Sequence, residues 1–70
     1  MKLVTWNVNG IRAAIKKGFY EYIDKRNPDV ICLQETKLSR NVVSPEISGY
    51  YSFYNDAERN GYSGTAIFSR

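Results

Sequence analysis

Apolar and polar positions divide the chain into short strands and one long helical stretch. Residues 3–8 are rich in Val, Thr and Trp, which favour a pleated, half-buried surface, and they predict a strand. Over residues 11–26 the apolar side chains recur at spacings of three and four, which predicts a helix. Gly18 interrupts this pattern and costs about 1 kcal/mol in a helix interior. We therefore expect two helical pieces or a kink at Gly18.

A second strand pattern covers residues 29–33. Its apolar positions are continuous rather than alternating, which is typical of a strand covered on both faces. Pro28 ends the preceding helix, and Asn27 is biased toward extended backbone because it precedes proline. A strand, a helix and a second strand in this order predict two parallel strands joined by a right-handed crossover. Both strands then end at the same edge of the sheet.

The second half of the chain predicts two further strands. Residues 50–55 are rich in aromatic side chains, residues 56–64 form a polar connection, and residues 65–69 are again apolar. We expect the last two strands to form an antiparallel hairpin with a long connection. The order β-α-β-β-β predicts a mixed α/β (α+β) fold. Because no repeat or internal boundary is visible, we treat residues 1–70 as one unit.

Composition narrows the class of protein. The apolar content of 43% is that of a globular protein and excludes disorder. The longest apolar run is too short to span a membrane, and we expect no membrane association. A net charge of +3 suits a polyanionic partner without demanding one. The chain has no histidine and one cysteine, Cys32, which excludes a Cys/His zinc site and an internal disulfide. With no room for a signal peptide before the first strand, we expect a cytoplasmic protein.

Polar side chains follow both strands of the predicted parallel pair. Asn7 comes at the end of the first strand, and Glu35 comes just after the second. Ligand sites in sheets flanked by helices lie beyond the carboxyl ends of the strands. Mg²⁺ takes oxygen ligands and often uses only one or two carboxylates. Glu35 would supply the charge. Asn7 would supply either a neutral oxygen ligand or a hydrogen bond that orients the carboxylate.

Plainer interpretations of the same residues stay open. Glu35 could be a solvated carboxylate at a strand end, and Asn7 could be a buried amide that closes a turn. Gln34 could orient Glu35 or cap the strand. Asn9 stands before Gly10 in the place of a good helix N-cap, so we expect it to be structural.

Basic residues open the predicted helix. Arg12 would lie close to the strand ends and could reach a phosphate, and the first N–H groups of the helix suit an anion. Lys16 and Lys17 lie one turn further on, and the alternative for all three is an ordinary solvated helix face. Tyr62 could pack against a nucleic-acid backbone or simply belong to the connection between strands.

Three segments of the chain resemble one protein family. Residues 5–13 (TWNVNGIRA), residues 28–37 (PDVICLQETK) and residues 61–66 (GYSGTA) resemble the exonuclease III-type apurinic/apyrimidinic (AP) endonucleases. The segments occur in the family's order with plausible spacings, and the resemblance covers essentially the whole chain. The ending Gln-Glu-Thr-Lys of the middle segment is its most specific part.

The resemblance implies a fold and an activity. The fold is the endonuclease/exonuclease/phosphatase type, a four-layer α/β-sandwich of two packed sheets with helices outside, of which this chain would be the N-terminal part. Such enzymes use Mg²⁺ or Mn²⁺ to cut double-stranded DNA 5′ to abasic sites in base-excision repair. Many also act as 3′-5′ exodeoxyribonucleases or 3′ phosphodiesterases.

The resemblance also assigns residues. Glu35 matches the family's metal-ligand glutamate, and Asn7 matches the asparagine beside it in the catalytic metal site. Arg12 and Lys17 match positions that contact the DNA backbone. Two further positions match a loop that contacts DNA, namely Gly61 and Tyr62.

The chain departs from the family in two ways. Asn9 stands where part of the family has aspartate, so no direct metal bond is expected from that position. Family enzymes continue well beyond Arg70 with a tyrosine, a water-orienting aspartate, an Asp-x-Asn segment, a final Asp-His pair and the second sheet. We therefore predict that the chain is an N-terminal fragment, that it is inactive and poorly stable alone, and that it needs the remainder of the parent chain.

Two other functions compete with this one. The first is another phosphoesterase of the same fold, which acts on sugar, lipid or general nucleic-acid phosphates. The second is a small basic module that binds nucleic acid without cutting it. It would show salt-dependent DNA binding that needs no divalent cation.

Overall fold

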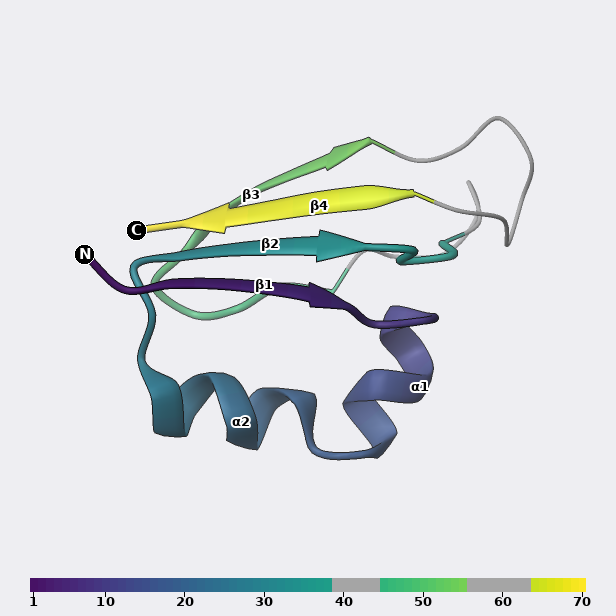
Figure 1. Cartoon of the computed structure of the whole chain (residues 1–70), viewed down its shortest axis with the longest axis horizontal. Coiled ribbons are helices and arrows are strands. Elements are labelled where there is room, and N and C mark those ends of the chain that lie inside the picture. Colours follow the sequence, from purple (N-terminus) through teal and green to yellow (C-terminus); the bar gives the residue numbers. More distant parts are fainter. Residues whose placement is uncertain (39–44, 56–63) are drawn as a thin grey trace.

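Two helices cover one face of a four-stranded sheet in the computed structural model, which describes residues 1–38, 45–55 and 64–70 (Figure 1). The elements predicted from the sequence are present. The bounds of three of the four strands differ from the prediction by one residue. They are β1 (Leu3–Asn7), α1 (Ile11–Lys16), α2 (Phe19–Arg26), β2 (Val30–Gln34), β3 (Tyr51–Asn55) and β4 (Thr65–Ser69).

The sheet has the strand order β1-β2-β4-β3. β1 and β2 are parallel, with Asn7 opposite Gln34, so the prediction that both strands end at one edge is confirmed. β4 is antiparallel to β3, which confirms the pairing of the last two strands, and it is also antiparallel to β2. β4 therefore lies between β2 and β3, and its pairing with β2 joins the hairpin of β3 and β4 to the parallel pair.

The helical stretch breaks where the sequence predicts. Gly18 has a φ of 101° and separates α1 from α2. At the other end of α2 the prediction of an extended Asn27 is wrong, because Asn27 has a φ of 49° and a ψ of 54°. Its N–H donates to the carbonyl oxygen of Ile23 at 2.8 Å, and asparagine tolerates this left-handed conformation. The hydrogen bond that closes the helix therefore outweighs the bias that Pro28 imposes.

The core lies between the helices and the sheet. The fully buried side chains are contributed by both layers, and the largest of them are Phe19, Phe68, Ile11, Ile31 and Leu33. Trp6 of β1 packs on α2, with its ring centroid 5.5 Å from that of Phe19 and 5.0 Å from that of Tyr22. This packing fixes the helices against the sheet and so fixes the loop between β1 and α1.

The other face of the sheet is open in the described part of the chain. Tyr51 and Phe53 are 74% and 63% exposed, and Ile67 is also exposed. Cys32 is only half-buried on this face. The prediction that residues 29–33 are covered on both faces is therefore not met here. None of the described helices is both long and apolar enough to span a membrane.

Candidate functional site

The carboxyl ends of β1 and β2 are tied together beyond the last residues of the strands. The N–H of Val8 donates to the carbonyl oxygen of Gln34 at 3.0 Å, and that of Gly10 donates to the carbonyl oxygen of Glu35 at 2.7 Å. The N–H of Ile11 donates to the carbonyl oxygen of Thr36 at 2.9 Å. The loop that enters α1 therefore runs along the segment that leaves β2, and this brings Asn7 and Glu35 to one edge.

The carboxamide of Asn7 bridges the two segments. Its Nδ2 donates a hydrogen bond to Oε2 of Glu35, and its Oδ1 accepts one from the N–H of Asn9 at 3.1 Å. A donor nitrogen on the carboxylate and an acceptor oxygen on a backbone N–H fix the orientation of the amide. The predicted meeting of Asn7 and Glu35 is thus present, with Glu35 half-buried and Asn7 exposed.

The backbone around the pair is in the left-handed region at three residues that are not glycine. The φ angles are 47° at Asn9, 54° at Glu35 and 56° at Lys37. Such φ values are uncommon for residues with a side chain. Asparagine tolerates them, whereas at Glu35 and Lys37 they cost about 1–2 kcal/mol each. The hydrogen bonds described above hold Asn9 and Glu35 in this conformation. Backbone strain gathered at one edge of a sheet is itself a pointer to a functional site.

A close approach between Thr36 and Gly64 attaches β4 to this edge. The N–H of Thr36 donates to the carbonyl oxygen of Gly64 at 3.1 Å. A Cβ on Gly64 would lie 2.6 Å from Oγ1 of Thr36, and Gly64 has a φ of 100°. Thr36 is 1% exposed, and its Oγ1 has no hydrogen-bond partner among the residues that the structure describes. Only glycine fits at position 64 without moving its neighbours.

Lys37 is a candidate site residue that the sequence argument missed. Its Nζ donates a hydrogen bond to Oδ1 of Asn9, which places an exposed cation beside the Asn7–Glu35 pair. The prediction that Asn9 caps the helix is wrong, because the N-cap of α1 is Gly10 and no side chain caps it. The left-handed turn after β2 carries Lys37 back to Asn9. The feature of the sequence that could have pointed to Lys37 as a site residue was its place in the Gln-Glu-Thr-Lys segment.

The basic residues of α1 and its C-cap lie on the surface. Arg12, Lys16 and Lys17 are exposed. Arg12 lies closest to the edge, because it follows directly after Ile11, whose N–H donates to the carbonyl oxygen of Thr36. The expected anion-binding N–H groups are not available at Gly10 and Ile11, because both already donate to carbonyl oxygens. The two predicted loop positions, Gly61 and Tyr62, lie outside the described residues.

Gln34 has neither of the roles that the sequence left open. Its Nε2 donates to Oγ1 of Thr5 at 3.0 Å and to the carbonyl oxygen of Cys32 at 3.3 Å. It therefore links β2 to β1 on the open face of the sheet and makes no contact of this kind with Glu35.

The donor set fits part of a site for a hard divalent cation. Among residues 1–38, 45–55 and 64–70, no three His, Cys, Asp or Glu side chains gather as a complete metal site would require. Glu35 contributes one carboxylate, and Mg²⁺ is often held by one or two carboxylates together with waters and substrate phosphates. The hollows found on the described surface lie around Tyr50, away from Asn7 and Glu35, so the candidate site here is an exposed edge.

An exposed edge that gathers a carboxylate, a bridging amide and a cation could hold a divalent ion together with a phosphate ester, and comparison with known proteins gives the family. The sequence matches the Endonuclease/Exonuclease/phosphatase family over residues 4–70, and the chain belongs to that family. It is 46% identical to the exodeoxyribonuclease of Bacillus subtilis, over all of this chain and 28% of that protein. It is 40% identical to a DNA-(apurinic or apyrimidinic site) endonuclease of Dictyostelium discoideum, over all of this chain and 20% of that protein.

Solved structures show the same fold. The catalytic domain of APE2 from Xenopus laevis has a TM-score of 0.84 at 43% identity, over 100% of this chain and 23% of that chain. The AP endonuclease LMAP from Leishmania major has a TM-score of 0.82 at 36% identity, over 99% of this chain and 23% of that chain. The resemblance to exonuclease III-type AP endonucleases and the predicted fold class are both confirmed. The chain spans about a quarter of the length of these proteins.

Proposed function

We propose that the chain is the N-terminal part of a divalent-metal-dependent DNA repair nuclease. The enzyme would hydrolyse the phosphodiester 5′ to an abasic site in double-stranded DNA, act as a 3′-5′ exodeoxyribonuclease, or do both in base-excision repair. The observation that carries the proposal is the Asn7–Glu35 hydrogen bond at the strand ends. It occurs in a chain whose relatives are named as exodeoxyribonucleases and AP endonucleases.

Glu35 would hold Mg²⁺ or Mn²⁺ through its carboxylate. When bound, the ion would polarise a phosphoryl oxygen and stabilise the leaving alkoxide. Asn7 supports this role by donating to Oε2 of Glu35, since outer hydrogen bonds of this kind orient metal ligands. Because the oxygen of Asn7 accepts from the N–H of Asn9, we assign Asn7 the orienting role. A direct metal bond from Asn7 stays a prediction.

The cations near the edge would position the DNA. Arg12 in the first turn of α1 and Lys17 at its C-cap are exposed and would contact backbone phosphates, with Gly61 and Tyr62 as a further DNA-contacting loop. Lys37 would add positive charge next to the carboxylate. Such contacts fix the register of a protein on the duplex without reading its sequence.

The remainder of a longer parent chain would complete the enzyme. The chain spans 28% and 20% of its first two relatives, and one apolar face of its sheet is open. We propose that the remaining part supplies the other metal ligands and covers this face. The 70-residue chain alone would be inactive and of low stability, since a chain of this length buries only about 60% of its unfolded surface. A cytoplasmic location stays a prediction.

Incision of an abasic duplex by the full-length protein tests the proposal. We expect cleavage that requires Mg²⁺ and is abolished by EDTA. Asn7→Ala should lower the rate about 10–100-fold, as loss of an outer hydrogen bond at a metal site does, and Glu35→Gln should lower it further. Glu46→Gln is the matched control, because Glu46 is an exposed carboxylate outside the site. Full cleavage by the E35Q protein would refute the assignment.

The choice of substrate separates the competing functions. An AP endonuclease cuts the abasic duplex but leaves an intact duplex and inositol phosphates untouched. A phosphoesterase of another type cuts one of the latter. A non-catalytic module binds DNA without a divalent cation, and its binding is unchanged by Glu35→Gln.

The salt dependence of DNA binding tests the basic residues. Each phosphate contact that is lost should reduce the slope of log K against log salt concentration by about 0.9. We expect this reduction for Arg12→Gln and for Lys17→Gln. Lys25→Gln serves as control, since Lys25 is exposed on α2 and should leave the slope unchanged. An equal reduction for all three variants would mean that only net charge matters.

A further inference from the structure

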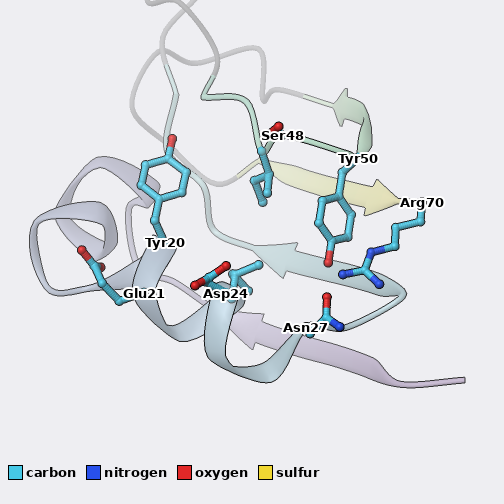
Figure 2. A pocket seen from close by; sticks show the side chains of 9 residues that line it. Tyr20, Glu21, Asp24, Asn27, Ser48, Tyr50 and Arg70 are labelled. Atoms are coloured by element: carbon cyan, nitrogen blue, oxygen red, sulfur yellow. The ribbon is translucent and has the colours of Figure 1, made fainter.

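A hollow of about 430 Å³ lies between α2 and the segment that leads into β3 (Figure 2). It is at the opposite end of the sheet from Asn7, because Arg70 follows Ser69, which pairs with Val30 at the start of β2. Along a five-residue strand this places the hollow about 13 Å or more from the candidate metal site. The residues that line it on α2 and on the facing segments include Tyr20, Asp24, Asn27, Ile47, Tyr50 and Arg70.

Two tyrosine rings stand on opposite sides of the hollow, and both are held in place (Figure 2). The ring of Tyr20 packs edge-on against the fully buried Phe19, with a centroid distance of 5.6 Å. The hydroxyl of Tyr50 donates a hydrogen bond to the carbonyl oxygen of Pro28. Rings fixed in advance lose little conformational entropy when they bind a ligand.

The charges around the hollow are mostly negative. Asp24 and Glu21 of α2 line it, and both side chains are exposed. Within the described part of the chain, no hydrogen bond or ion pair engages either carboxylate. The cation of the lining is Arg70, whose guanidinium carbon lies 5.1 Å from the centroid of the Tyr50 ring. One ring of the hollow, that of Tyr50, is thus already in contact with a guanidinium.

We propose that this hollow docks a basic, arginine- or lysine-containing segment of a partner protein. A cationic side chain enters between Tyr20 and Tyr50, where the ring faces attract it, and its charge pairs with Asp24 and Glu21. A nucleic acid is the wrong occupant, because the two carboxylates repel phosphates. Since the hollow and the Asn7–Glu35 edge lie at opposite ends of the sheet, a partner and DNA can be bound at the same time.

Binding of a labelled peptide to the full-length protein tests this proposal. The probe is a fluorescein-labelled peptide of four arginines separated by glycines, and the control probe carries four glutamates instead. The measurement is fluorescence polarisation without DNA, because DNA would itself bind the basic peptide. We expect saturable binding of the arginine peptide and none of the glutamate peptide.

Substitutions in the hollow identify where the peptide binds. The double change Tyr20→Ala with Asp24→Asn should raise Kd about tenfold or more, since it removes one ring and one charge. Tyr20→Phe keeps the ring and should keep the affinity within about twofold. Glu46→Gln makes the same charge change as Asp24→Asn in the neighbouring hollow, which Glu46 lines, and should have less effect than Asp24→Asn. Thermal unfolding of each variant checks that the fold is intact, and Asp24→Asn alone remains informative if Tyr20→Ala unfolds the protein.

Three results would overturn the proposal. The first is no saturable binding of the arginine peptide. The second is an equal loss of affinity for Asp24→Asn and Glu46→Gln, which would mean that the peptide does not bind specifically in this hollow. The third is a structure of the full-length protein in which its own later residues fill the hollow. None of these depends on the nuclease assignment, since cleavage of abasic DNA is measured separately and should be unchanged by Asp24→Asn.

Discussion

Backbone hydrogen bonds close both ends of the sheet, but the two ends use their side chains differently. At the carboxyl ends of β1 and β2, backbone N–H groups donate to the carbonyl oxygens of residues 34–36, and three residues with side chains have positive φ. At the opposite end, the N–H of Asp29 donates to the carbonyl oxygen of Lys2 at 2.8 Å, and the N–H of Arg70 donates to that of Asp29 at 3.1 Å. Two side chains add bonds to the backbone there: Asp29 accepts from the N–H of Lys2 at 2.6 Å, and the Tyr50 hydroxyl donates to the carbonyl oxygen of Pro28. Only one residue with a side chain, Asn27, has a positive φ at that end of the described structure.

This difference separates stability from function. At the opposite end the side chains of Asp29 and Tyr50 bond to backbone groups and so add to the closure of the fold. At the carboxyl end the side chains of Asn7, Glu35 and Lys37 belong instead to a chain of side-chain hydrogen bonds, which gathers a carboxylate and a cation at one exposed edge. The left-handed conformations are the energetic cost of this arrangement, and sites that bind ligands commonly carry such strain.

The largest expected effect compares one glycine from each end. Gly64→Ala should lower the free energy of unfolding by about 2–4 kcal/mol, because the new Cβ meets Oγ1 of Thr36 at 2.6 Å in a left-handed backbone. Gly49→Ala also changes a residue with positive φ but has no atom within 4 Å of the new Cβ, so it should cost only about 1 kcal/mol. Urea unfolding of the full-length protein measures both.

Removing the threonine hydroxyl sharpens this comparison. In the Gly64→Ala background, Thr36→Ala should restore part of the lost stability, because it removes the oxygen that the new Cβ meets. A double-mutant cycle gives the coupling between the two positions. Equal effects of Gly64→Ala and Gly49→Ala would show that the close approach at Thr36 is relieved without cost.

The next effect compares Lys37 and Asn27, two residues whose backbone is in the left-handed region. Lys37→Gly should raise the free energy of unfolding by up to about 1 kcal/mol, since glycine adopts a φ of 56° without strain. The same variant should lower abasic-site cleavage, because it removes the cation beside Asn9. Asn27→Gly should change stability by less, about 0.5 kcal/mol or under, because asparagine already tolerates this conformation. Cleavage should be unchanged by Asn27→Gly.

Lys37→Ala is the control for this pair. Alanine lacks the amine but keeps a Cβ, so cleavage should fall as it does for Lys37→Gly, without the gain in stability. Thermal unfolding and a cleavage time course on the same preparations give both quantities. If Lys37→Gly gained stability and kept full activity, the link between strain and function at this end would be wrong.

The sequence was sufficient for the parts of the fold that depend on local periodicity. It predicted the strand–helix–strand order, the break at Gly18 and the pairing of the last two strands. From the parallel pair it also followed that Asn7 and Glu35 share an edge. These inferences succeeded because period, strand direction and turn residues all indicate the same topology.

What the sequence did not predict depends on backbone conformations set by tertiary contacts. The bond between Lys37 and Asn9 requires a left-handed turn after β2, which no local pattern indicates. The expectation that a residue before proline is extended was wrong at Asn27, because the hydrogen bond that closes α2 outweighs the bias that Pro28 imposes. The hollow at Tyr50 joins residues from α2, from the segment before β3 and from the position after β4, so only the folded chain reveals it. The sequence shows a glycine at position 64, but it does not show that the neighbouring Thr36 is what requires a glycine there.

The smallest expected effect concerns the carboxylate that ties the opposite end of the sheet. The backbone hydrogen bond from Lys2, helped by the nearby positive charges of the N-terminus and Arg70, lowers the pKa of Asp29 below its usual value of 3.8. A lowered pKa in the folded protein means that the ionised form stabilises the fold above pH 3.8, and that this contribution is lost as the pH falls through the lowered value. D29N should therefore be less stable than the native protein at pH 7 and equally stable well below pH 3.8. Thermal unfolding of both proteins over pH 2–7 measures the difference, and a gap that stayed constant over this range would mean that Asp29 acts through packing rather than through its charge.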